Sequence, residues 1–378
     1  MRPQQSCSGA HGPRMILSRS NVVHYLLDQG LLSYGTVVND DLTVADSTRR
    51  NRNFKVLRGA EQGFFIKQIQ TFDPPTVATL AAEAGCYQLA REVPELSALA
   101  AIVPRDLLYD RQRHILVTGL LPSAESLMEH HRRLNAFPVD VARLFGGQLG
   151  RLHRESLPPL EGRPEASLFH RQPPWALSSH QLGTFGALNG ASSKLLQILQ
   201  DYPDFQRTLD EMRGDWRCER LVHGDLKWEN CVVYPCRSND GKLDGRIVDW
   251  ELADIGDPAW DVGGMLQAYI CFWILTMQFH ADVPLTTVEQ SAPHPIAGMQ
   301  PSIRAFWAAY VAELRLESAA ADTMLMRSVK YGAARMIQTA YEAMQYSAQI
   351  SPSALALLQV SLNILKEPKR AATQLLGL

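Results

Sequence analysis

The sequence has no excess of charge of either sign. Its 378 residues include 37 lysines and arginines against 39 aspartates and glutamates, which gives a formal net charge of -2. The basic residues are dispersed, apart from the group Arg49, Arg50 and Arg52. Proteins that bind nucleic acid or anionic membranes present a basic surface. The composition therefore argues against both kinds of partner.

Cysteine is scarce and has no pattern. The six cysteines show none of the paired spacings that hold zinc. Cys231 and Cys236 lie on and just after a predicted core strand, where we expect the reduced thiols of a cytoplasmic protein and no disulfides. Residues 1–14 are polar and contain no apolar stretch, so we expect a disordered extension and no signal peptide there.

Long apolar runs are also few. The stretch from Val262 to Phe279 is nearly long enough to span a bilayer. It carries Gly263, Gly264 and Gln267 near its start and has no flanking basic clusters, which membrane spans usually have. We therefore interpret it as a buried helix of a globular protein, with a membrane span as the alternative.

The most informative segment of the chain is the run His223-Gly224-Asp225-Leu226-Lys227-Trp228-Glu229-Asn230. Asp249 follows nineteen residues after Asn230. A carboxylate such as Asp225 accepts a proton from an attacking hydroxyl, while amide and carboxylate oxygens such as those of Asn230 and Asp249 are ligands that Mg²⁺ prefers. These residue types at this spacing suit phosphoryl transfer.

A predicted hairpin brings Asn230 and Asp249 together. The apolar residues 231–234 and 247–248 predict two short strands, and Ser238-Asn239-Asp240-Gly241 predicts the turn between them. The first strand begins just after Asn230 and the second ends just before Asp249. The two side chains are therefore expected at the same end of the hairpin.

A third element, Gly256-Asp257-Pro258-Ala259-Trp260-Asp261, completes a pattern in the order His-Gly-Asp-x-x-x-x-Asn, Ile-x-Asp-Trp-Glu, Gly-Asp-Pro-x-x-Asp. This pattern resembles the catalytic core of the aminoglycoside phosphotransferase and choline kinase-like families. The resemblance implies an α+β, bilobal protein-kinase-like fold, with a small N-terminal β-sheet lobe and a larger, mainly helical C-terminal lobe. By resemblance, Asp225 is the catalytic base, Asn230 and Asp249 hold Mg²⁺, Asp261 braces the catalytic loop, and His223 is a packing residue.

The resemblance also implies a role for Lys227. This lysine is two residues past the base, as in the Asp-Leu-Lys sequence of Ser/Thr protein kinases, and is expected to touch the transferring phosphoryl group.

The N-terminal part of the chain is expected to form the nucleotide-binding lobe. Apolar spacing predicts a helix over 15–32 that stops near Gly30, followed by strands at 42–45, 54–57 and 64–69 and by a helix after Pro74-Pro75. Lys67 lies late in the third strand, and Glu83 follows on the helix. Their spacing is similar to that of the kinase ion pair, in which the glutamate orients the lysine toward the α- and β-phosphates of ATP.

The loop expected to cover the phosphates contains no glycine. It reads Asp46-Ser47-Thr48-Arg49-Arg50-Asn51-Arg52-Asn53. Hydroxyls such as that of Ser47, or a guanidinium such as that of Arg49, would replace the backbone amides of a glycine-rich loop. A solvated basic turn is the alternative.

The segment from His114 to Pro122 is expected to be the last strand of the N-terminal lobe and the hinge. By resemblance, backbone groups near Thr118, Gly119 and Leu121 bond the adenine edge. We therefore expect a disordered extension over 1–14, an N-terminal lobe over 15–121, and a C-terminal lobe over 122–378 with the catalytic loop, metal site and acceptor site. Within that lobe His153 is expected in the core, and 156–190 is expected to be an insertion of undetermined role.

The acceptor is not specified by these motifs. From residue 262 onward seven acidic residues stand against eight basic ones, whereas a site for a polycationic aminoglycoside collects uncompensated carboxylates. The aromatic residues that could enclose a choline-like cation are expected to be core residues; they are Tyr269, Trp273, Trp307, Tyr310, Tyr331 and Tyr341. Our first hypothesis is thus an ATP- and Mg²⁺-dependent kinase for an alcohol hydroxyl of a small metabolite. A kinase for Ser or Thr in a peptide and a pseudokinase scaffold are the alternatives, and a homodimer remains open.

Overall fold

The computed structural model describes residues 15–39, 41–48, 50–59, 61–156, 158–181, 190–236, 241–279, 292–344 and 347–378. It divides into two compact units. We call them the sheet unit (the described residues up to Ala84 together with Pro104–Pro122) and the helical unit (Gly85–Val103 together with the described residues from Ser123 onward). The segment 85–103 thus belongs to the helical unit, although the sequence assigned it to the N-terminal lobe. The extension expected over 1–14 lies outside the described residues.

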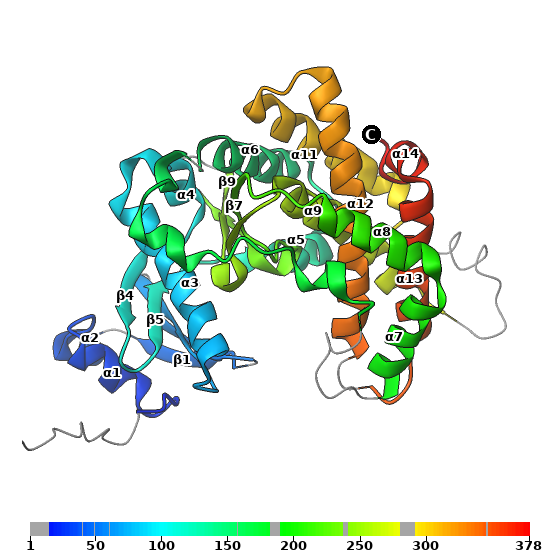
Figure 1. Cartoon of the computed structure of the whole chain (residues 1–378). Coiled ribbons are helices and arrows are strands. Elements are labelled where there is room, and N and C mark those ends of the chain that lie inside the picture. Colours follow the sequence, from blue (N-terminus) through cyan, green and yellow to red (C-terminus); the bar gives the residue numbers. More distant parts are fainter. Residues whose placement is uncertain are drawn as a thin grey trace, which may run out of the picture. The chain divides into compact units, whose positions relative to one another are not determined.

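The sheet unit is built on a five-stranded antiparallel sheet with the strand order β1-β2-β3-β5-β4 (Figure 1). Its elements in chain order are α1 (Val22–Asp28), α2 (Tyr34–Asn39), β1 (Leu42–Asp46), β2 (Arg52–Arg58), β3 (Glu61–Gln68), β4 (Asp106–Asp110) and β5 (Ile115–Gly119). The helix α3 (Pro74–Glu92) begins in this unit and ends in the helical unit.

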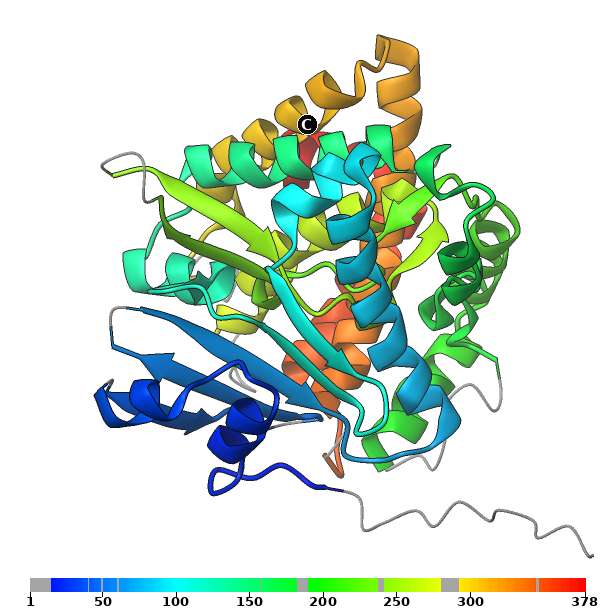
Figure 2. The ribbon, with the colours of Figure 1, turned by 90° about the vertical axis from the view of Figure 1, so that its left-hand side faces the viewer.

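The two faces of the sheet are covered differently. Successive residues of a strand point to opposite faces, and in β3 Phe64 and Ile66 are buried in a cluster with Tyr25 and Leu26 of α1. Lys67, between Ile66 and the end of the strand, therefore points to the other face. Figure 2 shows the long strands β2 and β3 that form the middle of this sheet.

The first helix is shorter than the sequence predicts. The Asn21 side chain accepts from Ser18 N and donates to the Ile16 carbonyl, so the chain turns here and the helix begins only at Val22. Gly30, with φ of 68°, follows its end, as expected. The helix is seven residues long, and Val22, Tyr25 and Leu26 are its buried residues.

The helical unit contains most of the helices and two small sheets. Its helices are α4 (Ser97–Ile102), α5 (Leu127–Leu134), α6 (Val139–Glu155), α7 (Gly190–Asp201), α8 (Pro203–Gly214), α9 (Pro258–Thr276), α11 (Ile296–Leu314), α12 (Ser318–Met344), α13 (Pro352–Lys366) and α14 (Pro368–Arg370). Its strands are β6 (Glu125–Ser126), β7 (Arg220–Val222), β8 (Cys231–Pro235), β9 (Leu243–Ile247) and β10 (Asp254–Gly256). A small antiparallel sheet unit and a larger helical unit confirm the α+β fold expected from the sequence.

The apolar stretch after Val262 is a core helix. Every residue of α9 from Pro258 to Ile274 is buried, and α9 packs against α12. None of the helices in the described parts of the chain combines the length and the hydrophobicity that a membrane span requires. None of the five cysteines in the described part of the chain forms a disulfide.

The packing of α9 on α12 depends on glycines. A Cβ atom on Gly263 would lie 2.6 Å from the Ser328 carbonyl oxygen and 2.7 Å from the Gly332 nitrogen. A Cβ atom on Gly264 would lie 2.4 Å from the Leu226 carbonyl oxygen. We call Gly263 and Gly264 the glycine notch of α9. Because the contacting atoms are backbone, only glycine permits α12 and the loop at Leu226 to come this close.

Candidate active site

The loop that carries Asp225 is held at its start by both carboxylate oxygens of Asp261. The loop leaves β7 at His223, and the carboxylate of Asp261 accepts hydrogen bonds from the backbone nitrogens of His223 (2.7 Å) and Gly224 (3.1 Å). Burial alone would raise the pKa of Asp261, but the hydrogen bond and charge of His153, together with the His223 contacts, outweigh burial and lower it. Asp261 thus acts as the brace that the resemblance implies.

His153 and His223 are packing residues, as expected. His153 is fully buried, with its Nδ1 atom 2.9 Å from the Tyr310 hydroxyl and its Nε2 atom 3.5 Å from Asp261. The His223 ring lies 2.9 Å from the Val248 carbonyl oxygen through Nε2, and its Nδ1 atom accepts from Asp225 N at 3.2 Å. One imidazole therefore ties the residue before Asp249 to the backbone of Asp225.

Gly224 is required by the shape of this loop. Its φ is 80°, in the left-handed region that favours glycine. A Cβ atom there would also lie 2.2 Å from the Leu252 carbonyl oxygen. The loop can reach Asp225 on this path only without a side chain at position 224.

The Asp225 carboxylate lies between two cations of the helical unit. Its Oδ2 atom is 2.8 Å from the Lys227 ammonium, and its Oδ1 atom is 3.1 Å from the Arg335 guanidinium. Burial favours the protonated acid, but Arg335 and then Lys227 outweigh that and lower the pKa of Asp225. The carboxylate is therefore ionised near neutral pH and able to accept a proton.

The predicted hairpin is present and carries Asn230 and Asp249 at one end. β8 pairs with β9 so that Cys231 lies opposite Ile247, and Val248 N donates to the Asn230 carbonyl at 2.9 Å. The turn expected at 238–241 lies outside the described residues except for Gly241, which has a φ of 82°.

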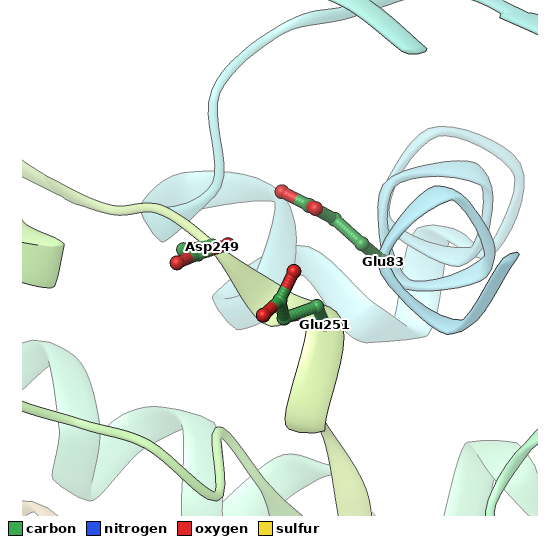
Figure 3. A group of neighbouring side chains, drawn as sticks. All are labelled: Glu83, Asp249 and Glu251. Atoms are coloured by element: carbon green, nitrogen blue, oxygen red, sulfur yellow. The ribbon is translucent and has the colours of Figure 1, made fainter. Parts of the chain in front are cut away.

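The side chains at this end fit a Mg²⁺ ion. The Asn230 amide donates through Nδ2 to the Asp225 carbonyl at 2.9 Å, so its oxygen is the atom that a metal ion would meet. Asp249 has a left-handed backbone (φ 67°, ψ 56°), and its carboxylate lies within 4.8 Å of that of Glu251 on the same short segment (Figure 3). Amide and carboxylate oxygens are the donor types that Mg²⁺ takes in phosphotransfer enzymes.

In the sheet unit, the ion pair expected from the sequence is present. Lys67 Nζ lies 2.8 Å from Glu83 Oε2, and both side chains are about 95% buried, with exposed fractions of 6% and 5%. Glu83 lies on α3, where Figure 3 labels it. The pair fixes the lysine on the face of the sheet opposite α1; the contact of Lys67 with a nucleotide remains a prediction.

The other predicted nucleotide contacts of the sheet unit lie on the β1–β2 connection and at the end of β5. Ser47 N donates to the Asn53 carbonyl at 2.8 Å, and Thr48 N donates to Asp46 Oδ1 at 2.8 Å, so side chains and strand ends close this glycine-free connection. Arg49 lies outside the described residues. Whether the arginines of this connection bind phosphate stays a prediction.

At the end of β5 the hinge amides are partly used within the sheet unit. Thr118 is buried and pairs with Phe65. Gly119 N donates to the Arg105 carbonyl at 2.8 Å, and Leu120 N donates to the Gly63 carbonyl at 2.9 Å. Two amides of this segment are thus already bonded within the sheet unit, and the adenine contacts of Thr118, Gly119 and Leu121 stay predictions.

The sequence analysis missed Arg335. It counted this residue only among the bases after residue 262, yet the side chain reaches Asp225 and is 2% exposed. A signal was available: Arg335 interrupts the apolar run of Ala333, Ala334, Met336 and Ile337, all of which are buried. An arginine inside such a run needs polar partners in the core.

The sequence profile of the phosphotransferase enzyme family matches residues 41–283, which is more than half of the chain and includes the segments of both units described above. The chain belongs to the phosphotransferase enzyme family. This membership confirms the expected resemblance and the expectation of a phosphotransferase with an alcohol group as acceptor. Arg335 lies beyond the matched residues. A comparison with curated proteins finds no match.

Solved structures match the chain at low sequence identity. A choline kinase from Cryptosporidium parvum Iowa II is 11% identical with a TM-score of 0.56, and the match covers 95% of this chain and 99% of that one. The choline kinase LicA from Streptococcus pneumoniae (14% identity, TM-score 0.46, 91% and 99% covered) and the macrolide 2'-phosphotransferase MphH from Brachybacterium faecium (16%, 0.45, 91% and 98%) also match. The phosphotransferase has the protein-kinase-like fold that the sequence predicts.

Proposed function

We propose that the protein transfers the γ-phosphoryl group of ATP, with Mg²⁺, to an alcohol hydroxyl of a small-molecule metabolite. The acceptor's O–H proton passes to the Asp225 carboxylate as the acceptor oxygen bonds to the γ-phosphorus. The bond from that phosphorus to the bridging oxygen breaks, and ADP leaves with both electrons of the bond. Positioning and charge neutralisation supply most of the catalysis in such a reaction.

The observation that carries the proposal is the preparation of Asp225 as a base. Its carboxylate is held ionised between Arg335 and Lys227, and its loop is fixed through Asp261 and Gly224. A general base must be ionised and in a fixed position when the acceptor arrives.

The residues for ATP and Mg²⁺ follow the same scheme. Asn230 and Asp249 hold Mg²⁺, which neutralises phosphate charge when bound. Lys67, oriented by Glu83, contacts the α- and β-phosphates. Ser47 and the arginines of the β1–β2 connection contact the phosphates, and backbone groups from Thr118 to Leu121 contact adenine.

A small molecule without a large net charge is the proposed acceptor, because the charged groups around the base, Asp225 and Glu342 against Lys227 and Arg335, offset one another. Lys227 lies 4.0 Å from Glu342 of α12, and Tyr341 beside it makes an edge-on ring contact with Trp175 at 5.6 Å. Trp175 belongs to the 156–190 segment, so that segment contributes to this region. Tyr269, Trp273, Tyr310 and Tyr331 are buried core residues and so do not form a cage for a cationic acceptor.

The test is turnover of Mg²⁺-ATP by the full chain over a panel of alcohols, amino sugars, choline analogues and Ser/Thr peptides, with the phosphorylated product identified by ³¹P NMR. Asp225→Asn is expected to lower kcat by orders of magnitude while nucleotide binding persists, because only the proton acceptor is lost. Asp249→Asn is expected to weaken Mg²⁺-dependent nucleotide binding as well.

The matched control is Asp244→Asn on β9, since Asp244 pairs with Tyr234 and Arg246 away from the hairpin end that carries Asp249. Wild-type activity in both the Asp225 and Asp249 variants would refute the assignment. Phosphorylation of peptides alone would replace the small-molecule acceptor with a peptide hydroxyl.

A further inference from the structure

Arg335 connects α12 to all three residues around the proposed base. Its Nη1 atom donates to the Gly224 carbonyl at 2.9 Å, and its Nη2 atom donates to the Leu226 carbonyl and to Asp225 Oδ1, both at 3.1 Å. The guanidinium also lies 5.2 Å from the centre of the Trp260 ring. The planar fork of an arginine suits such a set of acceptors, and lysine cannot reproduce it.

The close packing of α9 and α12 positions the Arg335 side chain. The glycine notch of α9 lets α12 approach, and a Cβ atom on Gly264 would lie 3.1 Å from Arg335 Nε as well as clashing with Leu226. Trp260, one turn before the notch, donates through its indole nitrogen to the same Gly224 carbonyl at 2.8 Å. The carbonyls of residues 224 and 226 are thus both bonded by side chains from outside the loop.

The two carboxylate oxygens of Asp225 have partners that differ in how firmly they are held in place. Oδ1 faces Arg335, whose side chain is 3% exposed and makes two further hydrogen bonds to backbone carbonyls. Oδ2 faces Lys227, whose side chain is 30% exposed and ends a flexible stem. An incoming hydroxyl needs one carboxylate oxygen, and Lys227 is the partner that can yield its place.

We propose that Arg335 is a positioning residue: it stays hydrogen-bonded to Oδ1 of Asp225, so that Oδ2 is the atom that accepts the proton. This inference rests on the proposed function of Asp225 as the base. Lys227 is the exchangeable partner: it leaves Oδ2 as the acceptor hydroxyl arrives. The hydroxyl proton moves to Oδ2, the acceptor oxygen bonds to the γ-phosphorus, and the phosphorus–oxygen bond to ADP breaks.

The helix α12 carries Arg335, the fixed partner of Asp225, and also Glu342, which lies beside the exchangeable partner Lys227. Glu342, seven residues after Arg335 on the same helix, lies 4.0 Å from Lys227. Gln338, between them, donates to Glu342 at 2.9 Å. Lys227 thus has a second carboxylate within reach when it releases Oδ2.

The experiment compares Arg335→Lys with two matched variants, Arg327→Lys and Lys227→Ala. Arg327 lies on the same helix and binds Asp257 at the start of α9 but does not touch the loop, so its variant controls for loss of helix packing. Lys227→Ala removes the partner that we propose to be exchangeable. Thermal unfolding gives the folded fraction of each variant.

The first readout is steady-state turnover per folded molecule. Arg335→Lys is expected to lower kcat by roughly 100-fold, with the Michaelis constant for ATP within about twofold of wild type, because a displaced base slows chemistry and leaves nucleotide binding intact. Arg327→Lys is expected to lower the melting temperature with kcat unchanged. A kcat for Arg335→Lys equal to that of wild type, or reduced only in proportion to the folded fraction, would overturn the proposal.

The second readout is amide hydrogen exchange over residues 223–227, which does not require turnover. Arg335→Lys is expected to speed exchange in this loop while the middle of α9 stays protected, and Lys227→Ala is expected to leave the loop as in wild type. Equal loosening by both substitutions would refute the division into a fixed and an exchangeable partner. Absence of turnover in the wild-type protein would refute the proposed function, whereas the exchange pattern still decides whether Arg335 fixes the loop.

Discussion

Replacing Gly224 by alanine tests whether the path of the catalytic loop is set by sterics, and Gly241 provides a control. The two glycines have nearly equal φ values, 80° and 82°. Among the described residues, a Cβ atom on Gly241 would have nothing within 4 Å, whereas one on Gly224 would lie 2.2 Å from the Leu252 carbonyl oxygen. Both alanines therefore bear the same backbone strain, and only the one at position 224 also clashes.

The magnitudes follow from this difference. The left-handed conformation costs alanine about 1–2 kcal/mol, so Gly241→Ala is expected to lose about that much stability. A carbon–oxygen contact of 2.2 Å must lengthen by roughly 1 Å to reach van der Waals distance, which moves Gly224 N away from Asp261 and loses a charge-assisted hydrogen bond of about 1.5–3 kcal/mol. Gly224→Ala is thus expected to lose about 2.5–5 kcal/mol in all.

Turnover separates the two variants further. A shift of about 1 Å at the base is expected to lower kcat on the order of 100-fold, whereas Gly241→Ala should keep wild-type kcat. Urea unfolding and steady-state kinetics at 25 °C measure both effects. Equal stabilities and equal kcat values for the two variants would show that the loop adapts freely, and the steric argument would be wrong.

Three further predictions concern side chains with charge. Glu83→Ala is expected to lower the free energy of unfolding by about 3–5 kcal/mol, measured in denaturant, because it leaves the Lys67 ammonium buried. Turnover should fall in both Lys67→Ala and Glu83→Ala, and the double variant should be little worse than Lys67→Ala. Strict additivity of the two losses would contradict the coupling of these residues. Alanine at one of Arg49, Arg50 and Arg52 is expected to raise the Michaelis constant for ATP about tenfold or more, without a matching change in the Michaelis constant for the acceptor. If all three single variants keep wild-type ATP saturation, the phosphate contacts are assigned to Ser47, Thr48 and Lys67 instead. The pKa of Asp261 is lowered in the folded protein, so its contribution to stability is present above its ordinary pKa of about 3.9 and is lost as the pH falls below that value. Between pH 6 and pH 3 the urea midpoint should therefore fall less steeply for Asp261→Asn than for wild type. Parallel plots of urea midpoint against pH for the two proteins would refute this linkage.

Local sequence signals were sufficient for the parts of the site that lie on one hairpin or one strand–helix step. The β8–β9 hairpin follows from two apolar runs with a turn between them, and the pairing of Cys231 with Ile247 places Asn230 and Asp249 at its end. The Lys67–Glu83 pair spans only sixteen residues, from one strand to the next helix, and its similarity to the kinase ion pair was enough to predict it.

Contacts between distant segments could not be predicted in the same way. Arg335 and Asp225 are 110 residues apart, and their contact depends on the crossing of α9 and α12 at the glycine notch. Periodicity shows which face of α12 is apolar, but it does not show which helix that face meets. The length of α1 was wrong for a different reason: the side chain of Asn21 turns the backbone where apolar spacing alone continues the helix.

The burial of α9 on all sides has a consequence for the synthesis of the chain. This helix ends at Thr276, and α12, which covers it, begins only at Ser318. During translation an almost wholly apolar helix therefore leaves the ribosome before its partner has been made, and domains of this size expose such surfaces in folding intermediates. Chaperone engagement is expected to begin at this point of elongation, and chains cut short before Ser318 should aggregate because they lack α12, the helix that packs most extensively on α9.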